Sequence, residues 1–399
     1  MTMSGKAEKN ATVTYFLSSG ENPVTREQAI WGDPLPISRT NQPETADPGV
    51  RYGDYFSAVR RFLEADGCER LLRPASICLQ RTVHQEDLLE IQIILEKHGE
   101  FYHPARIKTI LEDQTLQFVV NAAVSRPGQE SIEREHGWLN QLGRAHVAGF
   151  LPEVYGLDTV QTGDGGVIKL FLGQWFENHS EFHQTRLPDG TVKIVVWDKA
   201  EEACYLTADQ TWEMYREAAR ILTHYYNIET FEQVYPWHHA AGDFVIDLQQ
   251  GQVDLKLVTV RGYVSPLEPE ERNRKDQDLP SILEAMLVFF LNLSIRTRLD
   301  RIDGVGEIVW SDEAAVQGTV DGFFAGLLSK PQIRLTPVPL SHAFQYYVST
   351  YNPSELFDIA SDIVNAYHPL APEVPVIRKH LEKHVSDLIF EIKSKKLPD

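Results

Sequence analysis

A polar stretch near the middle of the chain carries the residues best suited to chemistry. Residues 236–247 read PWHHAAGDFVID, and a second apolar run at 253–258 follows the glycine at Gly251. This alternation of a polar turn, a short apolar segment, a glycine turn and another apolar segment predicts a loop that leads into a β-hairpin. Imidazole and carboxylate side chains such as those of His238 and Asp243 act as general bases or metal ligands. The stretch therefore predicts a catalytic or ligand-binding loop.

The layout of this loop resembles the catalytic segment of the aminoglycoside phosphotransferase and choline kinase branch of the protein-kinase-like fold. Over residues 85–265 the chain is similar to that family in pattern. The resemblance implies ATP and magnesium as cofactors. Phosphoryl transfer then needs a cation at the α- and β-phosphates, an acid that fixes this cation, a base for the substrate hydroxyl and two metal ligands.

The loop fits the family pattern in two registers. In the first, which we prefer because it keeps the spacing to the next strand, Asp243 takes the place of a metal-binding asparagine and His238, five residues earlier, that of the base. In the second, the segment from His239 to Asp243 stands for the family's His-Gly-Asp, so that Asp243 is the base and Asp247 the nearest metal ligand. Asp243 has a role in both registers.

The cation and its acid are expected in the amino-terminal part of the chain. Glu135, on a predicted helix at 130–142, resembles the glutamate that fixes the phosphate-binding lysine, although a solvated position on the helix surface is an equally good interpretation. The lysine position itself is held by Asn121, which has no charge to offer a phosphate. Lys108 or Arg106 on the neighbouring strand is a possible substitute, although a solvent-facing residue on an alternating strand is the more ordinary interpretation.

Two of the four chemical groups are missing from their expected places. Asn121 replaces the lysine, and the segment 257–261, LVTVR, has no carboxylate where the family has its second metal ligand. The turn at 97–104 also lacks the several glycines with which backbone amides wrap phosphates, which favours a packed turn. The sequence therefore predicts weak or absent binding of magnesium-ATP.

The elements that position these residues follow from the hydrophobic pattern. Apolar runs bounded by charged or turn residues predict strands, and apolar residues three and four apart predict helices. Residues 112–114 form a tight turn between two of the strands. The predicted strands of the first half are 89–95, 105–111, 116–124, 150–155 and 167–175, with the helix 130–142 between the third and fourth.

This order predicts an α+β protein with a two-lobed, protein-kinase-like (aminoglycoside phosphotransferase-like) fold. Residues 1–50 have no sustained period and predict a flexible or surface-wrapped arm. Residues 51–176 form the small lobe with an antiparallel sheet and a helix, and residues 177–399 a larger, mainly helical lobe with a helical carboxy-terminal extension. A helix at 211–226 precedes the polar loop.

Composition excludes several classes of protein. The formal net charge of −19 argues against a nucleic-acid or anionic-membrane binder, since such proteins need lysine and arginine to displace counterions. Three cysteines without a paired spacing indicate neither a disulfide framework nor a zinc site, and the first eleven residues lack an apolar signal core. The apolar run at 281–299 contains charged residues and predicts a buried helix. This acidic protein is therefore expected in the cytoplasm, without a membrane span.

Two further clusters invite a functional interpretation. His179 and His183 have metal-ligand spacing if their segment is helical, although ordinary surface histidines are the commoner case. Arg296, Arg298 and Arg301 suggest either charge pairing at a helix end or an anion-binding patch.

The pattern as a whole predicts a pseudokinase, a diverged kinase-like protein with weak or no activity that binds a small molecule or a protein partner in the cleft between its lobes. His238, His239, Asp243 and Glu135 are expected to converge in that cleft. One alternative is an active small-molecule phosphotransferase that uses ATP and a divalent metal. The other is an unrelated metal- or ligand-binding α+β protein.

Overall fold

The computed structural model describes residues 11–18, 20, 22–36, 49–99, 101–146, 148–163, 165–197, 204–238, 242–266, 278–331 and 334–398. The chain divides into two compact units, Met1–Glu177 and Asn178–Asp399. Each of them folds around buried apolar side chains.

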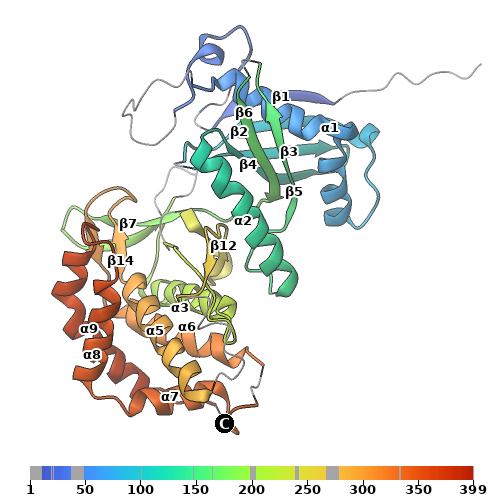
Figure 1. Cartoon of the computed structure of the whole chain (residues 1–399). Helices are drawn as coiled ribbons and strands as arrows, with labels where there is room; N and C mark the ends of the chain where they lie inside the picture. Colours follow the sequence, from blue (N-terminus) through green and yellow to red (C-terminus); the bar gives the residue numbers. More distant parts are fainter. Residues whose placement is uncertain are drawn as a thin grey trace, which may run out of the picture. The chain divides into compact units, whose positions relative to one another are not determined.

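The first unit is built on a six-stranded sheet (Figure 1). β1 pairs with β2 in parallel, and the other neighbours are antiparallel in the order β1-β2-β3-β4-β6-β5. The strands are β1 (Thr12–Leu17), β2 (Leu88–Leu95), β3 (His103–Leu111), β4 (Thr115–Ala123), β5 (Val154–Gln161) and β6 (Val167–Gln174).

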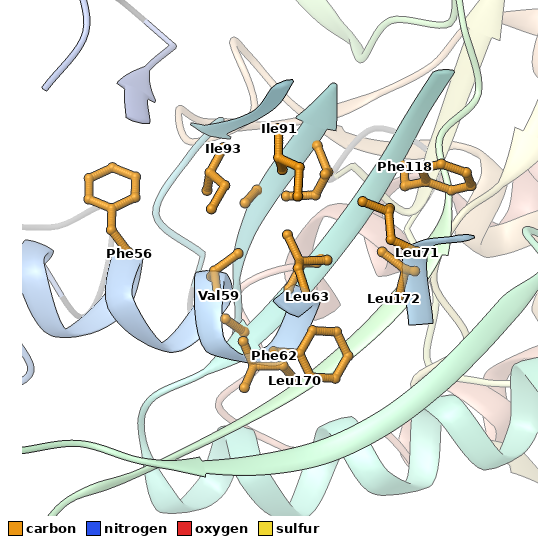
Figure 2. Packing of buried hydrophobic residues seen from close by; sticks show 14 of the residues in the cluster. Phe56, Val59, Phe62, Leu63, Leu71, Ile91, Ile93, Phe118, Leu170 and Leu172 are labelled. Carbon is orange, nitrogen blue, oxygen red and sulfur yellow. The ribbon is translucent and has the colours of Figure 1, made fainter. Parts of the chain in front are cut away.

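One face of this sheet is covered by helix α1 (Tyr52–Leu79). Its apolar side chains lie against alternate residues of β2, β3, β4 and β6, which point to the same face because side chains alternate along a strand. Figure 2 shows Phe56, Val59 and Leu63 of the helix facing Ile91 and Ile93 of β2. The main core of this unit therefore lies between α1 and the sheet.

Helix α2 (Arg126–Ala145) lies on the opposite face. It packs on β4, β5 and β6, and the ring of His136 lies 5.7 Å from that of Phe171, a β6 residue between Leu170 and Leu172 of the main core. The helix starts at Ser125, whose hydroxyl accepts a hydrogen bond from the Gly128 amide at 3.2 Å. The predicted packing of this helix on the sheet is confirmed.

The predicted antiparallel pairing around residues 112–114 is also confirmed. β3 and β4 pair from His103 and Ala122 to Ile110 and Thr115, and the turn closes with the Leu111 amide donating to the Gln114 carbonyl at 2.9 Å. The strand predicted at 150–155 instead begins at Val154. Pro152 explains the shift, since proline has no amide proton for a ladder.

The amino-terminal segment contains a strand that the sequence analysis did not assign. Thr12–Leu17 pairs in register with Glu90–Leu95 of β2, so of the two predicted forms of the arm, flexible or surface-wrapped, the flexible one does not hold for these residues. Tyr15 is buried and packs with Trp31 and Phe56 at ring distances of 5.2 Å each. This aromatic contact tethers the segment to α1.

The second unit is mainly helical. Its packing includes a close approach of α6 to α3, where a Cβ atom at Gly322 would lie 2.0 Å from the Arg216 carbonyl oxygen. The helices are α3 (Ala208–Tyr225), α5 (Leu279–Thr297), α6 (Glu313–Leu328), α7 (Leu340–Ser349), α8 (Pro353–Asn365) and α9 (Val374–Ser394).

Helix α5 is long and apolar enough to cross a membrane, judged by length and composition alone. In the structure it packs against α3, α6, α7 and α8, and Phe290 contacts Phe323 and Phe344 with ring distances of 4.6 and 5.8 Å. This packing is that of a core helix, as the charged residues in the run predict.

Small sheets complete the second unit. The predicted hairpin after the polar loop is present as β11 and β12, which pair in register from Phe244 with Leu257 to Asp247 with Asp254. The strands are β7 (Phe182–Arg186), β8 (Val192–Val196), β9 (Cys204–Tyr205), β10 (Gln233–Val234), β11 (Phe244–Asp247), β12 (Asp254–Leu257), β13 (Tyr263–Val264), β14 (Leu299–Arg301) and β15 (Ile308–Trp310).

Candidate functional site

Asp243 lies at the end of the polar loop, just before β11. Gly242 has a φ of 78°, a left-handed conformation that glycine adopts without steric cost. The Asp243 carbonyl then accepts a hydrogen bond from the Val258 amide at 2.8 Å, which ties the loop to the residue after β12. The side chain of Asp243 is buried, with 1% of the residue exposed.

The two carboxylate oxygens of Asp243 are both engaged. Oδ2 accepts a hydrogen bond from the backbone amide of His238 at 2.9 Å, and Oδ1 accepts one from Nη2 of Arg261 at 2.5 Å. The guanidinium of Arg261 also compensates the charge of the carboxylate. A buried carboxylate needs such a partner, since taking an unpaired charge out of water is costly.

Arg261 comes from the segment where the family resemblance places a second metal-binding acid. The sequence analysis noted that 257–261 lacks a carboxylate, but it did not identify Arg261 as a partner of Asp243. The side chain reaches the aspartate because the hairpin returns the chain past the end of the loop. The available signal was a positive charge shortly after the second hairpin strand, four residues beyond Leu257.

His238 contributes its backbone to this arrangement, while its imidazole fits the predicted role of a general base poorly. Burial, together with the positive charges of Arg296, Arg261 and Arg301, lowers the pKa of His238 to about 4. General bases work best with a pKa near the working pH. At neutral pH this imidazole is uncharged and weakly basic.

Asp247 lies at the turn end of the β11–β12 hairpin, whereas Asp243 lies at its open end. An extended strand advances about 3.3 Å per residue, so the Asp247 Cα is roughly 10 Å from that of Phe244. The strand thus separates the two carboxylates that the second register assigns to one magnesium ion. Asp247 is paired across the hairpin with Asp254, which forms an ion pair with Lys256 at 2.9 Å and lies 3.3 Å from Nε2 of His179.

In the first unit, Glu135 lies on the buried side of α2. It is 1% exposed and shares a helix face with Ile132 and Leu139, since residues three and four apart lie on one side. The alternative of a solvated acid on the helix surface is therefore wrong. A carboxyl group buried on a sheet-facing stripe needs polar partners there.

Asn121 lies on the α2 side of the sheet. Its neighbours Val120 and Ala122 belong to the core under α1, so its own side chain points to the other face. On β6, the next strand, Lys169 forms an ion pair with Glu133 of α2 at 2.5 Å. A strand lysine does meet a helix glutamate in this unit, but both differ from the predicted positions.

Lys108 and Arg106 lie on β3, on the same face as Asn121, because Ala105 and Ile107 between and beside them belong to the α1 core. Arg106 forms an ion pair with Glu96 at 2.7 Å and lies over the Trp175 ring at 5.4 Å. Arg106 is therefore already engaged by side chains of its own unit. The prediction that it could replace the phosphate-binding lysine did not foresee these partners.

The turn between β2 and β3 is closed by its own contacts. The Gly99 amide donates to the Tyr102 carbonyl at 3.0 Å, and the Tyr102 hydroxyl lies 2.8 Å from that of Ser131 on α2. His98 lies 3.2 Å from the Tyr52 hydroxyl of α1. These contacts confirm the prediction of a packed turn for the described residues of 97–104.

The proposed helical spacing of His179 and His183 is wrong. His179 lies in an irregular segment just after a turn, and His183 lies on strand β7, so their imidazoles are not one helical turn apart. His183 is 1% exposed and packs on the Trp197 ring at 4.5 Å. Across the described part of the chain, no group of three or more histidine, cysteine, aspartate or glutamate side chains is arranged to hold a metal ion.

The predicted site residues belong to different units. Glu135, Asn121 and Lys108 lie in Met1–Glu177, and His238, Asp243 and Asp247 in Asn178–Asp399. Within the second unit, His238 and Asp243 come together through a hydrogen bond. The convergence of Glu135 with them stays a prediction, and His239 lies outside the described residues.

Comparison with known proteins gives little further guidance. No family model matches the chain, and no curated protein matches it. Among solved structures, the chain is similar to WaaP in complex with acyl carrier protein, with a TM-score of 0.27 and 10% sequence identity over 76% of this chain and 98% of that chain. A likeness at this TM-score assigns neither a fold nor an activity.

Proposed function

We propose that this chain is a diverged kinase-like protein without phosphotransfer activity, which binds a small molecule or a protein partner at the Asp243 loop. The kinase-like part of the proposal rests on the order of elements in the first unit, three strands, a helix and two strands after α1, and on the mainly helical second unit. This is the order that the sequence resemblance implies.

The observation that carries the proposal is the pairing of Asp243 with Arg261. Magnesium is bound through carboxylates together with substrate phosphates. Here the carboxylate that both registers of the resemblance assign to chemistry accepts hydrogen bonds from a guanidinium and a backbone amide. A metal ion at Asp243 would have to displace the guanidinium of Arg261, so the site favours the arginine side chain over a metal ion.

Features of the first unit support the same proposal. Asn121 stands at the position of the phosphate-binding lysine, and the β2–β3 turn uses the Gly99 amide in an internal hydrogen bond. A nucleotide would therefore find neither a fixed charge nor a glycine-rich cradle at the expected places.

A thermal-shift measurement with ATP, alone and with magnesium or manganese, tests the proposal. A ligand at a hundred times its Kd stabilises a protein by about 2.7 kcal/mol. We expect 5 mM nucleotide with either metal to leave the unfolding midpoint unchanged within error. A shift that requires the metal and disappears in Asp243→Asn would favour the active phosphotransferase, with Asp243 as its metal ligand.

The same measurement addresses the remaining alternative. A metal-binding protein of another class would be stabilised by a transition metal alone, without nucleotide, and Asp243→Asn would not change this. Substitution of His179, which already pairs with Asp254 at 3.3 Å, would then reduce the shift.

A further inference from the structure

Two guanidinium groups flank the loop segment formed by Trp237 and His238. Nη2 of Arg296 donates a hydrogen bond to the Trp237 carbonyl at 3.0 Å, and Arg261 binds the Asp243 carboxylate that accepts the His238 amide. A continuous chain of hydrogen-bonded residues thus connects the two arginines. They come from distant parts of the sequence, the bend between β12 and β13 and the last turn of α5.

The charges in this region are unbalanced toward the positive. Asp243 compensates Arg261, but within the described ranges neither Arg296 nor Arg301 forms an ion pair. The neighbouring carboxyl group of Asp300 is buried, which raises its pKa to about 6, and it accepts a hydrogen bond from the Gln184 amide at 3.0 Å. At neutral pH its charge offsets that of one of the two arginines, so one positive charge remains in this region of a chain whose net charge is −19.

Arg296 is held in a fixed orientation with donor capacity left over. Its guanidinium lies over the rings of Tyr235 and Trp237, at 5.5 and 5.9 Å from their centres. Its Nε is buried and has no hydrogen-bond partner in the part of the chain that the structure describes. A buried donor without an acceptor is costly, and a fixed, planar guanidinium matches the oxygens of a carboxylate or a phosphate.

We propose that this unit binds a small oxyanion, a phosphate or carboxylate group, at Arg261 and Arg296 beside His238 and without a metal ion. The proposal rests on the proposed function, because it takes Arg261 as the positive charge that a metal ion would otherwise supply. The anion balances the excess charge and accepts hydrogen bonds from the donors that Arg261 and Arg296 still offer. The depressed pKa of His238 is consistent with the positive field that attracts the anion.

Titration calorimetry with inorganic phosphate and with citrate, on protein freed of metal ions by a chelating resin, tests this inference. We expect phosphate or citrate to bind, and Arg296→Met to weaken the binding at least tenfold, as removal of a charged hydrogen bond does. Arg186→Met is the matched control, since Arg186 is a half-exposed arginine of the same unit that pairs with Glu307. This control is expected to leave the affinity within twofold of wild type.

Arg296→Lys is a second variant that keeps the inference testable if Arg296→Met does not fold. Lysine keeps the positive charge but lacks the planar set of N–H donors of a guanidinium. We therefore expect an intermediate affinity for the anion and an unchanged circular dichroism spectrum. An affinity that falls equally in Arg296→Met and Arg186→Met would overturn the proposal, because general charge would then explain it. Absence of anion binding to the metal-free protein together with absence of magnesium-ATP binding would overturn the oxyanion site alone. Magnesium-dependent nucleotide binding would overturn the proposed function as well.

Discussion

The pairing of Asp243 with Arg261 predicts a strong energetic coupling between the two side chains. Asp243 is 1% exposed and the Arg261 side chain 34%. Removal of one partner of a buried ion pair costs about 3–5 kcal/mol, because the other charge is left buried without compensation. Since Arg261 is partly solvated and the His238 amide remains bound to Asp243, we expect Arg261→Met to cost about 3 kcal/mol.

Asp243→Asn relieves this cost in the Arg261→Met background, because the amide is isosteric and carries no charge. We expect Asp243→Asn alone and the double variant each to lose about 1 kcal/mol relative to wild type, so that the coupling energy from the full cycle is about 3 kcal/mol, at the upper end of the range for contacting residues. Urea unfolding monitored by tryptophan fluorescence measures it, with equal m-values as the criterion for comparable transitions.

Arg186→Met provides the reference for a surface pair. Its partner Glu307 is 64% exposed and the Arg186 side chain 44%, and exposed pairs contribute at most about 1 kcal/mol. If the costs of Arg261→Met and Asp243→Asn simply add, with coupling below about 0.5 kcal/mol, the ion pair does not organise the loop and the reasoning is refuted.

Two further predictions concern the rest of the fold. Burial lowers the pKa of His103 to about 4, so as the pH falls the unfolded chain binds a proton at this imidazole before the folded chain does. The free energy of unfolding therefore keeps the contribution of neutral His103 above pH 6.5. It loses this contribution, on the order of 3 kcal/mol, as the pH falls toward 4. His103→Gln should flatten acid unfolding over this window by circular dichroism, whereas the exposed His84→Gln should not. Gly322→Ala should lower the free energy of unfolding by about 1–3 kcal/mol through overpacking, and with it the unfolding midpoint, because the new Cβ would lie 2.0 Å from the Arg216 carbonyl oxygen. Gly137→Ala on the open side of α2, with no atom within 4 Å of the new Cβ, should raise the midpoint; equal effects of the two substitutions would contradict the packing argument.

Local patterns in the sequence predicted the elements that are stabilised locally. The turn at 112–114 lies between two apolar runs, and a tight turn fixes the pairing of its strands. The stripe at Ile132, Leu139 and Leu142 predicted the buried side of α2. Each of these signals lies within about twenty residues, where periodicity is informative.

Contacts between distant residues were missed because no local pattern encodes them. β1 pairs with β2 across about seventy residues of sequence, and its TVTYFL run has the β-branched and aromatic composition of a strand without a neighbouring turn to mark it. The spacing of His179 and His183 alone could not distinguish a helix from an irregular segment followed by a strand.

For the candidate site, the sequence indicated the loop and the importance of Asp243, but not the identity of its partner. Arg261 was noted only as part of a segment that lacks a carboxylate. Which side chain reaches a buried acid depends on how the hairpin folds back, and that is a property of the tertiary structure.

The central claim is that Arg261 occupies the place of a metal ion at Asp243. Calorimetric titration of magnesium-ATP into the wild-type protein at low ionic strength tests it most directly. The account predicts no binding at submillimolar concentrations. A submillimolar affinity that depends on magnesium and is abolished by Asp243→Asn would contradict it.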